Sequence, residues 1–150
     1  MDAFRTIFCS VLLACSLSGC ATLGNFGWGH VSERECLIRV MYFESSRSSP
    51  DGMLAVGTVV MNRVGDPRYP NTICGVVGQK NQFAEGVLTK KMTEGRSTAL
   101  AGEMADQILR GSRHRGVRDA KFFHTAGLSF PYGNMHYVLV AGGNAFYEKR

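Results

Sequence analysis

The sequence lacks the motifs that mark several common enzyme chemistries. Its four histidines, His30, His114, His124 and His136, form no HExxH motif and no i,i+4 pair that could hold a metal ion. It has neither a glycine-rich phosphate-binding loop after a strand nor a GxSxG motif. By elimination, acid–base catalysis by a carboxylate is the chemistry most available, and we expect no metal and no organic cofactor.

Long hydrophobic runs are also missing. The apolar stretch 7–17 follows the basic Arg5 and is too short for a membrane span, but its length is typical of an export signal. It ends in Leu-Ser-Gly-Cys20, which resembles a bacterial lipobox. We therefore predict a signal peptide over residues 1–19 that is cleaved before a lipidated Cys20. The alternative is a soluble export signal followed by a coincidental cysteine.

The predicted lipid anchor sets the organisation and the location of the chain. More than one acyl chain on Cys20 would give stable membrane attachment. Because Ala21 follows the cysteine, with no Asp there, we expect the outer membrane in a cell that has two membranes. Residues 20–32 then form a flexible, glycine-rich tether, and 33–150 form one catalytic domain. The expected product is an exported lipoprotein that faces the periplasm.

Cysteine is scarce in the expected mature chain. Removal of residues 1–19 leaves Cys20, Cys36 and Cys74, and the first of these is assigned to the lipid. In an oxidising compartment Cys36 and Cys74 are predicted to form a disulfide that would brace the helix around Cys36. The alternative is a pair of buried free thiols.

Acidic residues are outnumbered. Charged residues make up 19% of the sequence, and the net charge is +5. This balance fits an acidic partner such as peptidoglycan or an anionic lipid surface. The densest basic run, 110–118, could indicate nucleic acid in a cytosolic protein, but export argues against that partner, so we interpret it as a solvated loop.

Helical spacing of apolar residues dominates the first two thirds of the domain. Ser32 and Ser49 are predicted N-caps, and Pro50 fits the first turn of a helix. The helix that Pro50 opens is apolar nearly all round, which predicts a central position. The predicted helices cover 32–46, 53–64, 73–78 and 97–109, and the polar segment 79–96 is predicted to be a surface loop.

The pattern changes after the last of these helices. Residues 120–124 and 136–140 are predicted strands, and a glycine turn at 142–144 leads into a further extended segment at 145–147. The fold class is therefore α+β, with a helical N-terminal part and a small antiparallel sheet at the C-terminus.

Glu44 is the most informative single residue. Leu37, Val40 and Met41 share one face of the first predicted helix, and Glu44 takes the next position on that apolar face. A carboxyl group on a buried face has a raised pKa, because burial disfavours the charged form. Such a group can keep its proton near neutral pH and act as a general acid. The alternative is a surface or capping residue, with a helix that stops one turn earlier.

Short motifs around Glu44 and after it occur in a characteristic order. They are Tyr42-Phe43-Glu44-Ser45, Asn62-Arg63-Val64, Tyr69-Pro70, Cys74-Gly-Val-Val77 and Gln82-Phe83. In this order they resemble the SleB/CwlJ family of cell wall hydrolases, and the resemblance runs from about Cys36 to Tyr147. It implies a lysozyme-like α+β domain that acts on the glycan strands of peptidoglycan, with Glu44 as the catalytic acid.

The chain departs from the family pattern at two places. Ser45 stands where many members have alanine, and Ala84 stands where they often have serine, in a loop that is longer in those relatives. The sugar-contacting segment 82–91 is therefore the least transferable part. We predict that Gln82, Phe83 and His124 line the cleft, although Phe83 could equally be a core residue and His124 an ordinary strand residue. Asn62 and Arg63 are expected to tie helices together.

An ordinary glycosidase uses two carboxylates. The candidates for a second one are Asp51, Asp66, Glu85, Glu94 and Asp119, and only Asp51 lies near Glu44 in sequence, where it is better explained as a charge at a helix start. The family resemblance implies a lytic transglycosylase, in which one Glu can suffice. On that resemblance we predict a single catalytic Glu that cleaves the β-1,4 bond between N-acetylmuramic acid and N-acetylglucosamine. The alternatives are a non-catalytic peptidoglycan-binding lipoprotein and a peptidoglycan amidase.

Overall fold

The computed structural model describes residues 31–150. The predicted signal peptide, Cys20 and most of the predicted tether lie outside these residues. The elements in order are helices α1 (Glu33–Glu44), α2 (Pro50–Val64), α3 (Ile73–Val77) and α4 (Gly95–Leu109), the 3₁₀ turn η1 (Arg115–Val117), and strands β1 (Phe122–Thr125), β2 (Met135–Ala141) and β3 (Asn144–Lys149). The α+β fold class is confirmed.

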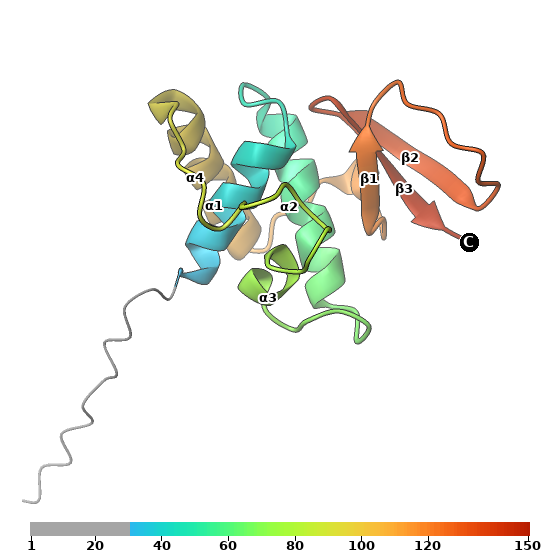
Figure 1. The fold of residues 1–150 in the computed structure, drawn as a ribbon, viewed down its shortest axis with the longest axis horizontal. Helices are drawn as coiled ribbons and strands as arrows, with labels where there is room; N and C mark the ends of the chain where they lie inside the picture. The colour runs from blue at the N-terminus through green and yellow to red at the C-terminus, as the bar shows by residue number, and fades with distance from the viewer. Residues whose placement is uncertain (1–30) are drawn as a thin grey trace, which may run out of the picture.

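The helices pack as one group, and the sheet lies to one side. Figure 1 shows α4, α1 and α2 next to one another, with the sheet on the far side of α2. α1 contacts each of the other three helices, and α2 contacts the helices, η1 and β2, which confirms its predicted central position. No helix within residues 31–150 is both long and apolar enough to cross a bilayer.

Each of the first three helices has an N-cap residue with a hydroxyl side chain. The Oγ atom of Ser32 accepts from the amide of Glu35, Ser49 accepts from Gly52, and Thr72 accepts from Gly75. Each bond satisfies one of the free amides of a first helical turn. The two serine caps were predicted. α4 starts two residues before its predicted start and has no such cap.

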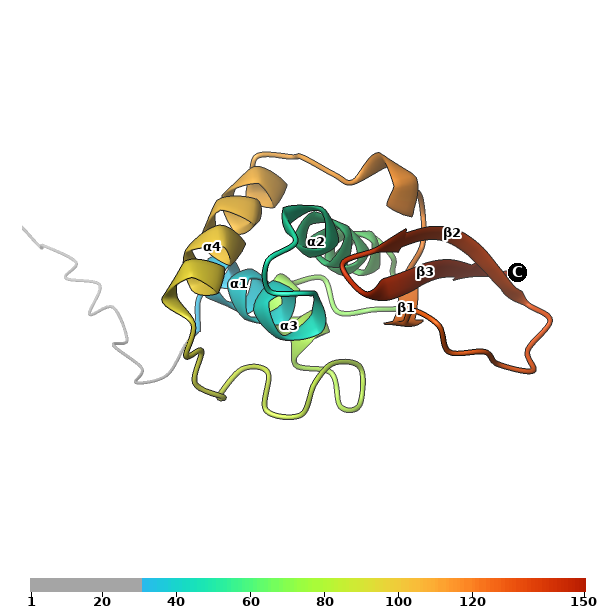
Figure 2. The ribbon, with the colours of Figure 1, turned by 90° about the horizontal axis from the view of Figure 1, so that it is seen from above.

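The sheet is antiparallel and has the order β1-β3-β2. Side chains alternate between its faces, so Phe123 and Phe146 point to the helices, and Phe146 is fully buried. The turn between β2 and β3 lies against the start of α2, where the amide of Ser46 donates to the carbonyl of Gly142 at 2.8 Å (Figure 2). The sheet is therefore fastened to the helices next to the end of α1.

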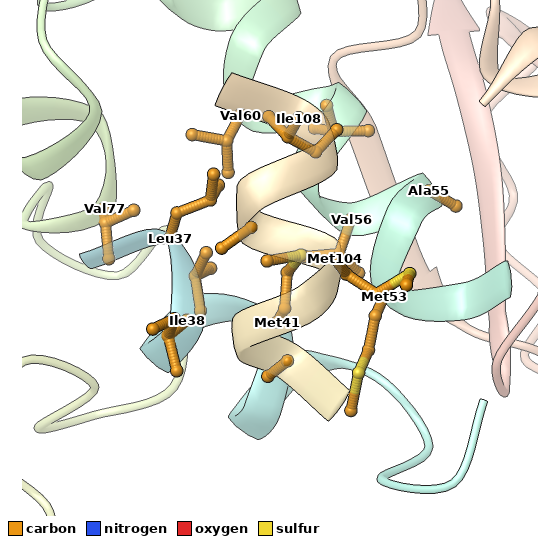
Figure 3. Packing of buried hydrophobic residues seen from close by; sticks show 14 of the residues in the cluster. Leu37, Ile38, Met41, Met53, Ala55, Val56, Val60, Val77, Met104 and Ile108 are labelled. Carbon is orange, nitrogen blue, oxygen red and sulfur yellow. The ribbon is translucent and has the colours of Figure 1, made fainter. Parts of the chain in front are cut away.

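The hydrophobic core forms where the four helices meet. Figure 3 shows side chains from α1, α2 and α4 interleaved, with Val77 of α3 at one edge. The predicted surface loop 79–96 contributes more than expected, because Val87 is only 6% exposed. Phe83, Leu88 and Met92 of the same segment are partly buried against the core. These contacts hold a largely polar and glycine-containing segment over the helices.

Cys36 and Cys74 form the predicted disulfide, which joins α1 to α3. The carboxylate of Glu33, at the start of α1, accepts hydrogen bonds from the amides of Ile73 (2.5 Å) and Cys74 (3.3 Å). α1 is therefore tied to α3 by a covalent bond and by these two hydrogen bonds.

Candidate active site

Glu44 is the last residue of α1. The helix ends there because the backbone of Ser45 is extended, with a φ of −115° and a ψ of 166°. The amide and the hydroxyl of Ser45 both donate to the carbonyl of Met41, at 3.3 and 2.9 Å, and so complete the last turn. The helix therefore does reach Glu44, and the alternative of an earlier end is wrong. The Glu44 side chain is half-buried at the edge of the core.

The surroundings of the Glu44 carboxyl group favour its protonated form. Burial raises its pKa, and two weaker influences lower it: a hydrogen bond from the backbone amide of Ala84 and the positive charge of Arg63. Burial wins, so the net shift is upward. A carboxyl group with this balance keeps its proton to a higher pH than an exposed glutamic acid, which is the requirement for a general acid.

Arg63 is the cation next to this carboxyl group. Its side chain is 4% exposed, its Nε atom donates to the carbonyl of Lys121 at 2.8 Å, and its Nη1 atom is buried without a hydrogen-bond partner. The guanidinium carbon lies 5.0 Å from the ring centre of Phe83 and 5.5 Å from that of Tyr69. Such cation–π contacts hold a buried guanidinium in place. Arg63 thus links α2 to the loop that carries Ala84.

The sequence suggested that Asn62 and Arg63 tie helices together, and this expectation is wrong. The Asn62 side-chain amide donates to the carbonyls of Arg118 and Ala120, both at 2.9 Å. Both residues therefore connect α2 to the chain segment before β1. Polar groups at the end of an apolar helix bond to whichever free carbonyls the fold brings there, and here these carbonyls belong to the segment before β1.

A contact from the sheet holds the main chain of Glu44. The side-chain amide of Asn144, the first residue of β3, donates to the carbonyl of Glu44 at 2.5 Å. Asn144 is 7% exposed, so this bond is shielded from water. The end of α1 is thereby held by β3, and its carboxyl group is held by the loop that carries Ala84.

Other carboxylates considered from the sequence do not join Glu44. Asp51 lies 2.9 Å from a ring nitrogen of His114, while Asp66 and Glu94 form ion pairs with arginines. The remaining two, Glu85 and Asp119, are exposed. Within the described part of the chain, the charged side chain that acts on Glu44 is a cation, and no second carboxylate does.

The predicted cleft residues Gln82 and Phe83 are adjacent in sequence but differ in environment. Gln82 is exposed, whereas Phe83 is half-buried against the core and lies 6.2 Å from the ring of Phe123. A pocket of about 510 Å³ is lined by residues 77–81 and 83–89, with Phe83 and Ala84 among them but not Gln82 or Glu44.

His124, the third predicted cleft residue, lies on β1 next to Phe123, and its side chain is on the opposite face of the sheet from Phe123. Its Nδ1 atom is 2.8 Å from the carbonyl of Thr125, which can only accept, so Nδ1 carries a proton. Its Nε2 atom is 2.8 Å from the hydroxyl of Tyr137. Both ring nitrogens thus have partners within the protein, and His124 itself lines a second pocket of about 240 Å³.

Sequence reasoning overlooked the roles of Arg63, Asn144 and Tyr147. The positive charge of Arg63 lowers the pKa of Tyr147, although burial raises it overall, so the phenol lies near the same guanidinium that acts on Glu44. One signal was available for Arg63. It is a cation in a helix that is otherwise largely apolar, the counterpart of a carboxylate on the apolar face of α1. Asn144 and Tyr147 offered no comparable signal.

No group of three or more histidine, cysteine, aspartate or glutamate side chains within residues 31–150 could hold a metal ion.

Two solved structures resemble this fold. The catalytic domain of the germination-specific lytic transglycosylase SleB from Bacillus anthracis is 20% identical, with a TM-score of 0.63, over 82% of this chain and 98% of that one. The catalytic domain of the Bacillus cereus SleB protein is 19% identical, with a TM-score of 0.58, over 80% and 93%.

At these identities the two structures establish a shared fold. No curated protein matches the sequence. The model of the cell wall hydrolase family matches residues 47–147. The matched segment begins just after Glu44 and covers about two thirds of the 150 residues. On that match the chain belongs to the cell wall hydrolase family.

Proposed function

We propose that this cell wall hydrolase is a lytic transglycosylase that uses Glu44 as its single acid–base group. The substrate is the glycan strand of peptidoglycan, and the bond cleaved is the β-1,4 link from N-acetylmuramic acid to N-acetylglucosamine. The observation that carries the proposal is the half-buried Glu44 carboxyl group, whose pKa is raised by burial and beside which residues 31–150 place no second carboxylate. The solved SleB domain described as a lytic transglycosylase supports it by analogy of fold.

The proposed reaction returns Glu44 to its starting state. The protonated carboxyl group donates its proton to the glycosidic oxygen as the bond from that oxygen to C1 of the muramic acid breaks. The resulting carboxylate then takes the proton of the 6-hydroxyl group of the same sugar, and that oxygen forms a new bond to C1. The products are a 1,6-anhydro sugar end and a free 4-hydroxyl group. No water is consumed, so one carboxyl group serves both steps.

The surrounding residues support this cycle. Burial stabilises the neutral acid before the first proton transfer, and the Ala84 amide and the Arg63 charge stabilise the carboxylate that exists between the two transfers. A group that must donate and then accept a proton needs both influences. Two carboxylates would be needed if water were the nucleophile of an ordinary glycosidase.

Product analysis tests the proposal. Purified peptidoglycan is incubated with the wild-type chain and with Glu44→Gln, and the soluble fragments are identified by mass spectrometry. We expect anhydro-muropeptides from the wild type and none from the variant, with an unchanged circular dichroism spectrum. Fragments with ordinary reducing ends, which are heavier by one water, would show that the enzyme hydrolyses the bond and is not a transglycosylase. Retained activity in Glu44→Gln would end the assignment of Glu44, and release of free stem peptide would indicate an amidase.

We also propose that the mature chain is a membrane lipoprotein anchored through Cys20. The support is the short apolar stretch followed by the Leu-Ser-Gly-Cys20 sequence, outside the described residues. Growth with an alkyne-labelled fatty acid should label the wild type and not Cys20→Ser. Equal labelling of the wild type and the variant, or no labelling of either, would contradict the proposed anchor.

A further inference from the structure

The outer face of the sheet carries a cluster of aromatic side chains that the proposed reaction does not use. The strand register places Phe122 and His124 of β1, Tyr147 of β3 and Tyr137 of β2 on one face, opposite the buried Phe146. Their rings are in contact. Phe122 stacks on Tyr147 with centres 5.4 Å apart, and His124 lies 5.5 Å from Tyr137. We call this set of four the aromatic face.

The loop between β1 and β2 adds two further rings beside this face. Phe130 lies edge-on to His124 at 4.7 Å, and Tyr132 is nearly parallel to Phe130 at 6.3 Å. Tyr132 is 65% exposed and Phe130 is 40% exposed. Large aromatic rings are seldom left open to water without a partner, and clustered exposed rings mark binding surfaces.

These rings enclose a pocket with polar groups at its edge. The pocket of about 240 Å³ is lined by His124, Phe130, Tyr132 and Tyr147, together with Asn134, Met135 and Lys149. Lys149 is exposed, its Nζ atom lies 4.6 Å from the centre of the Phe122 ring, and no carboxylate within residues 31–150 pairs with it. The combination of ring walls, an amide and a cation without a carboxylate partner suits a ligand that has apolar C–H faces, hydroxyl or acetamido groups, and a nearby negative charge.

The pocket and the Glu44 site are connected through β3. Asn144 at the start of β3 donates to the carbonyl of Glu44, and Tyr147 of the same strand lines the pocket with its ring 5.7 Å from that of His124. A linear polymer that reaches Glu44 and follows β3 would therefore meet the aromatic face.

We propose that the aromatic face and its pocket form a subsite for a sugar unit of the glycan strand away from the cleaved bond, with Lys149 binding a carboxylate carried by that unit. This proposal rests on the proposed function, since it takes peptidoglycan as the ligand. The pyranose ring stacks on the exposed rings, and the carboxylate is either that of a lactyl group or that of a stem peptide. The enzyme would thus hold a long strand while it cuts.

Binding in the absence of cutting tests the subsite. Full-length chains that carry Glu44→Gln are sedimented with insoluble purified peptidoglycan, and the apparent Kd is measured with and without Tyr132→Ala. We expect about a three- to tenfold weaker Kd from loss of the Tyr132 ring. Val140→Thr is the matched control, because Val140 is 68% exposed and does not line the pocket. An unchanged Kd for Tyr132→Ala would overturn the proposal even if wild-type cleavage occurs as proposed.

The charge is tested separately with Lys149→Met, using Arg96→Met on α4 as the control for net charge. We expect weaker binding from Lys149→Met alone. A larger loss on peptide-free glycan would identify the lactyl carboxylate as its partner, and a larger loss on peptide-bearing glycan would identify the stem peptide. Equal effects of the two variants would remove Lys149 from the subsite. A change of oligomeric state in Tyr132→Ala, with unchanged glycan binding, would show that this face instead joins two copies of the chain.

Activity gives a further readout. Because the subsite lies away from the cut, Tyr132→Ala should raise KM on long strands by about the same factor as Kd and leave kcat unchanged. Fragments too short to reach the pocket should be cleaved equally by both chains. A fall in kcat on such fragments would contradict the proposed location.

Discussion

Gly52 of α2 and Gly142 of the β2–β3 turn touch backbone to backbone. A Cβ atom on Gly142 would lie 2.5 Å from the Cα atom of Gly52, closer than real side chains allow, and Gly142 has a φ of +55°. This contact brings the sheet against the helices beside Ser46, two residues after Glu44. The position of the hairpin, and with it the Asn144 bond to Glu44, depends on the absence of two side chains.

Gly142→Ala should therefore destabilise the fold and weaken activity together. Overpacking costs about 1–3 kcal/mol, and the left-handed backbone adds about 1 kcal/mol. Thermal denaturation would measure the loss. Gly133→Ala is the matched control, since a Cβ atom there meets open space. An equal melting temperature for the two variants would contradict the close contact.

Glu44→Gln should stabilise the protein at neutral pH. The pKa of Glu44 in the folded state is raised by burial above its ordinary value of 4.5, so ionisation opposes folding. Its contribution to stability is complete below pH 4.5 and is lost as the pH rises through the folded-state pKa. Glutamine keeps the acceptor for the Ala84 amide and has no charge. Denaturant titrations should therefore show a variant that exceeds the wild type at pH 7, with a gap that closes near pH 4; a constant gap would point to another cause.

Arg63→Gln should move the pH profile of the reaction. The Arg63 charge lowers the pKa of Glu44, so its removal raises that pKa further. A general acid works while it is protonated, and the alkaline limb of kcat/KM should shift to higher pH. Arg63→Lys keeps the charge and should keep the limb near its wild-type position, although its packing against Phe83 is lost. A shift of the same size in both variants would show that packing, and not charge, sets the pKa.

Reduction of the disulfide should weaken the fold without abolishing it. Cys36 and Cys74 are 38 residues apart, and closing a loop of that size stabilises a protein by about 3–4 kcal/mol in the chain-entropy view. The double variant Cys36→Ala/Cys74→Ala should melt at the temperature of the reduced wild type. Its melting temperature should not change when reductant is added. Further loss on reduction of the double variant would mean that the stabilisation comes from elsewhere.

Tyr42→Phe should loosen the start of α4. The Tyr42 side chain is 1% exposed, and its hydroxyl accepts from the amides of Thr93 and Glu94, both at 3.2 Å. Loss of the hydroxyl leaves two partly accessible amides without this acceptor, which costs about 0.5–1.5 kcal/mol. Hydrogen exchange should rise at these two amides more than in α2. Uniform exchange across the helices would contradict a local effect.

Local signals predicted most of the fold. Ser32 and Ser49 marked helix starts because their hydroxyl groups cap free amides, and the change of pattern after the last predicted helix marked the strands. These features depend on neighbours in sequence. The position of Glu44 on an apolar helix face was equally visible, since 3.6 residues per turn fix which side chains share a face.

The partners of Glu44 could not be predicted in the same way. Ala84 binds it with a backbone amide, which every residue except proline possesses, so the residue type carries no information. Asn144 acts across a separation of 100 residues, which only the packed hairpin brings about. Of the predicted cleft residues, Phe83 packs beside Arg63, whereas Gln82 is exposed on the loop and His124 contacts Tyr137 within the sheet.

The Asn144 bond to Glu44 has a consequence for how the enzyme matures. Glu44 lies early in the chain, at the end of α1. The residue that anchors its main chain, Asn144, arrives only with β3, 100 residues later. A nascent chain that ends before β3 would therefore carry the Glu44 carboxyl group without the bond that holds its main chain, and the cleavage proposed for Glu44 would begin only after β3 has been synthesised.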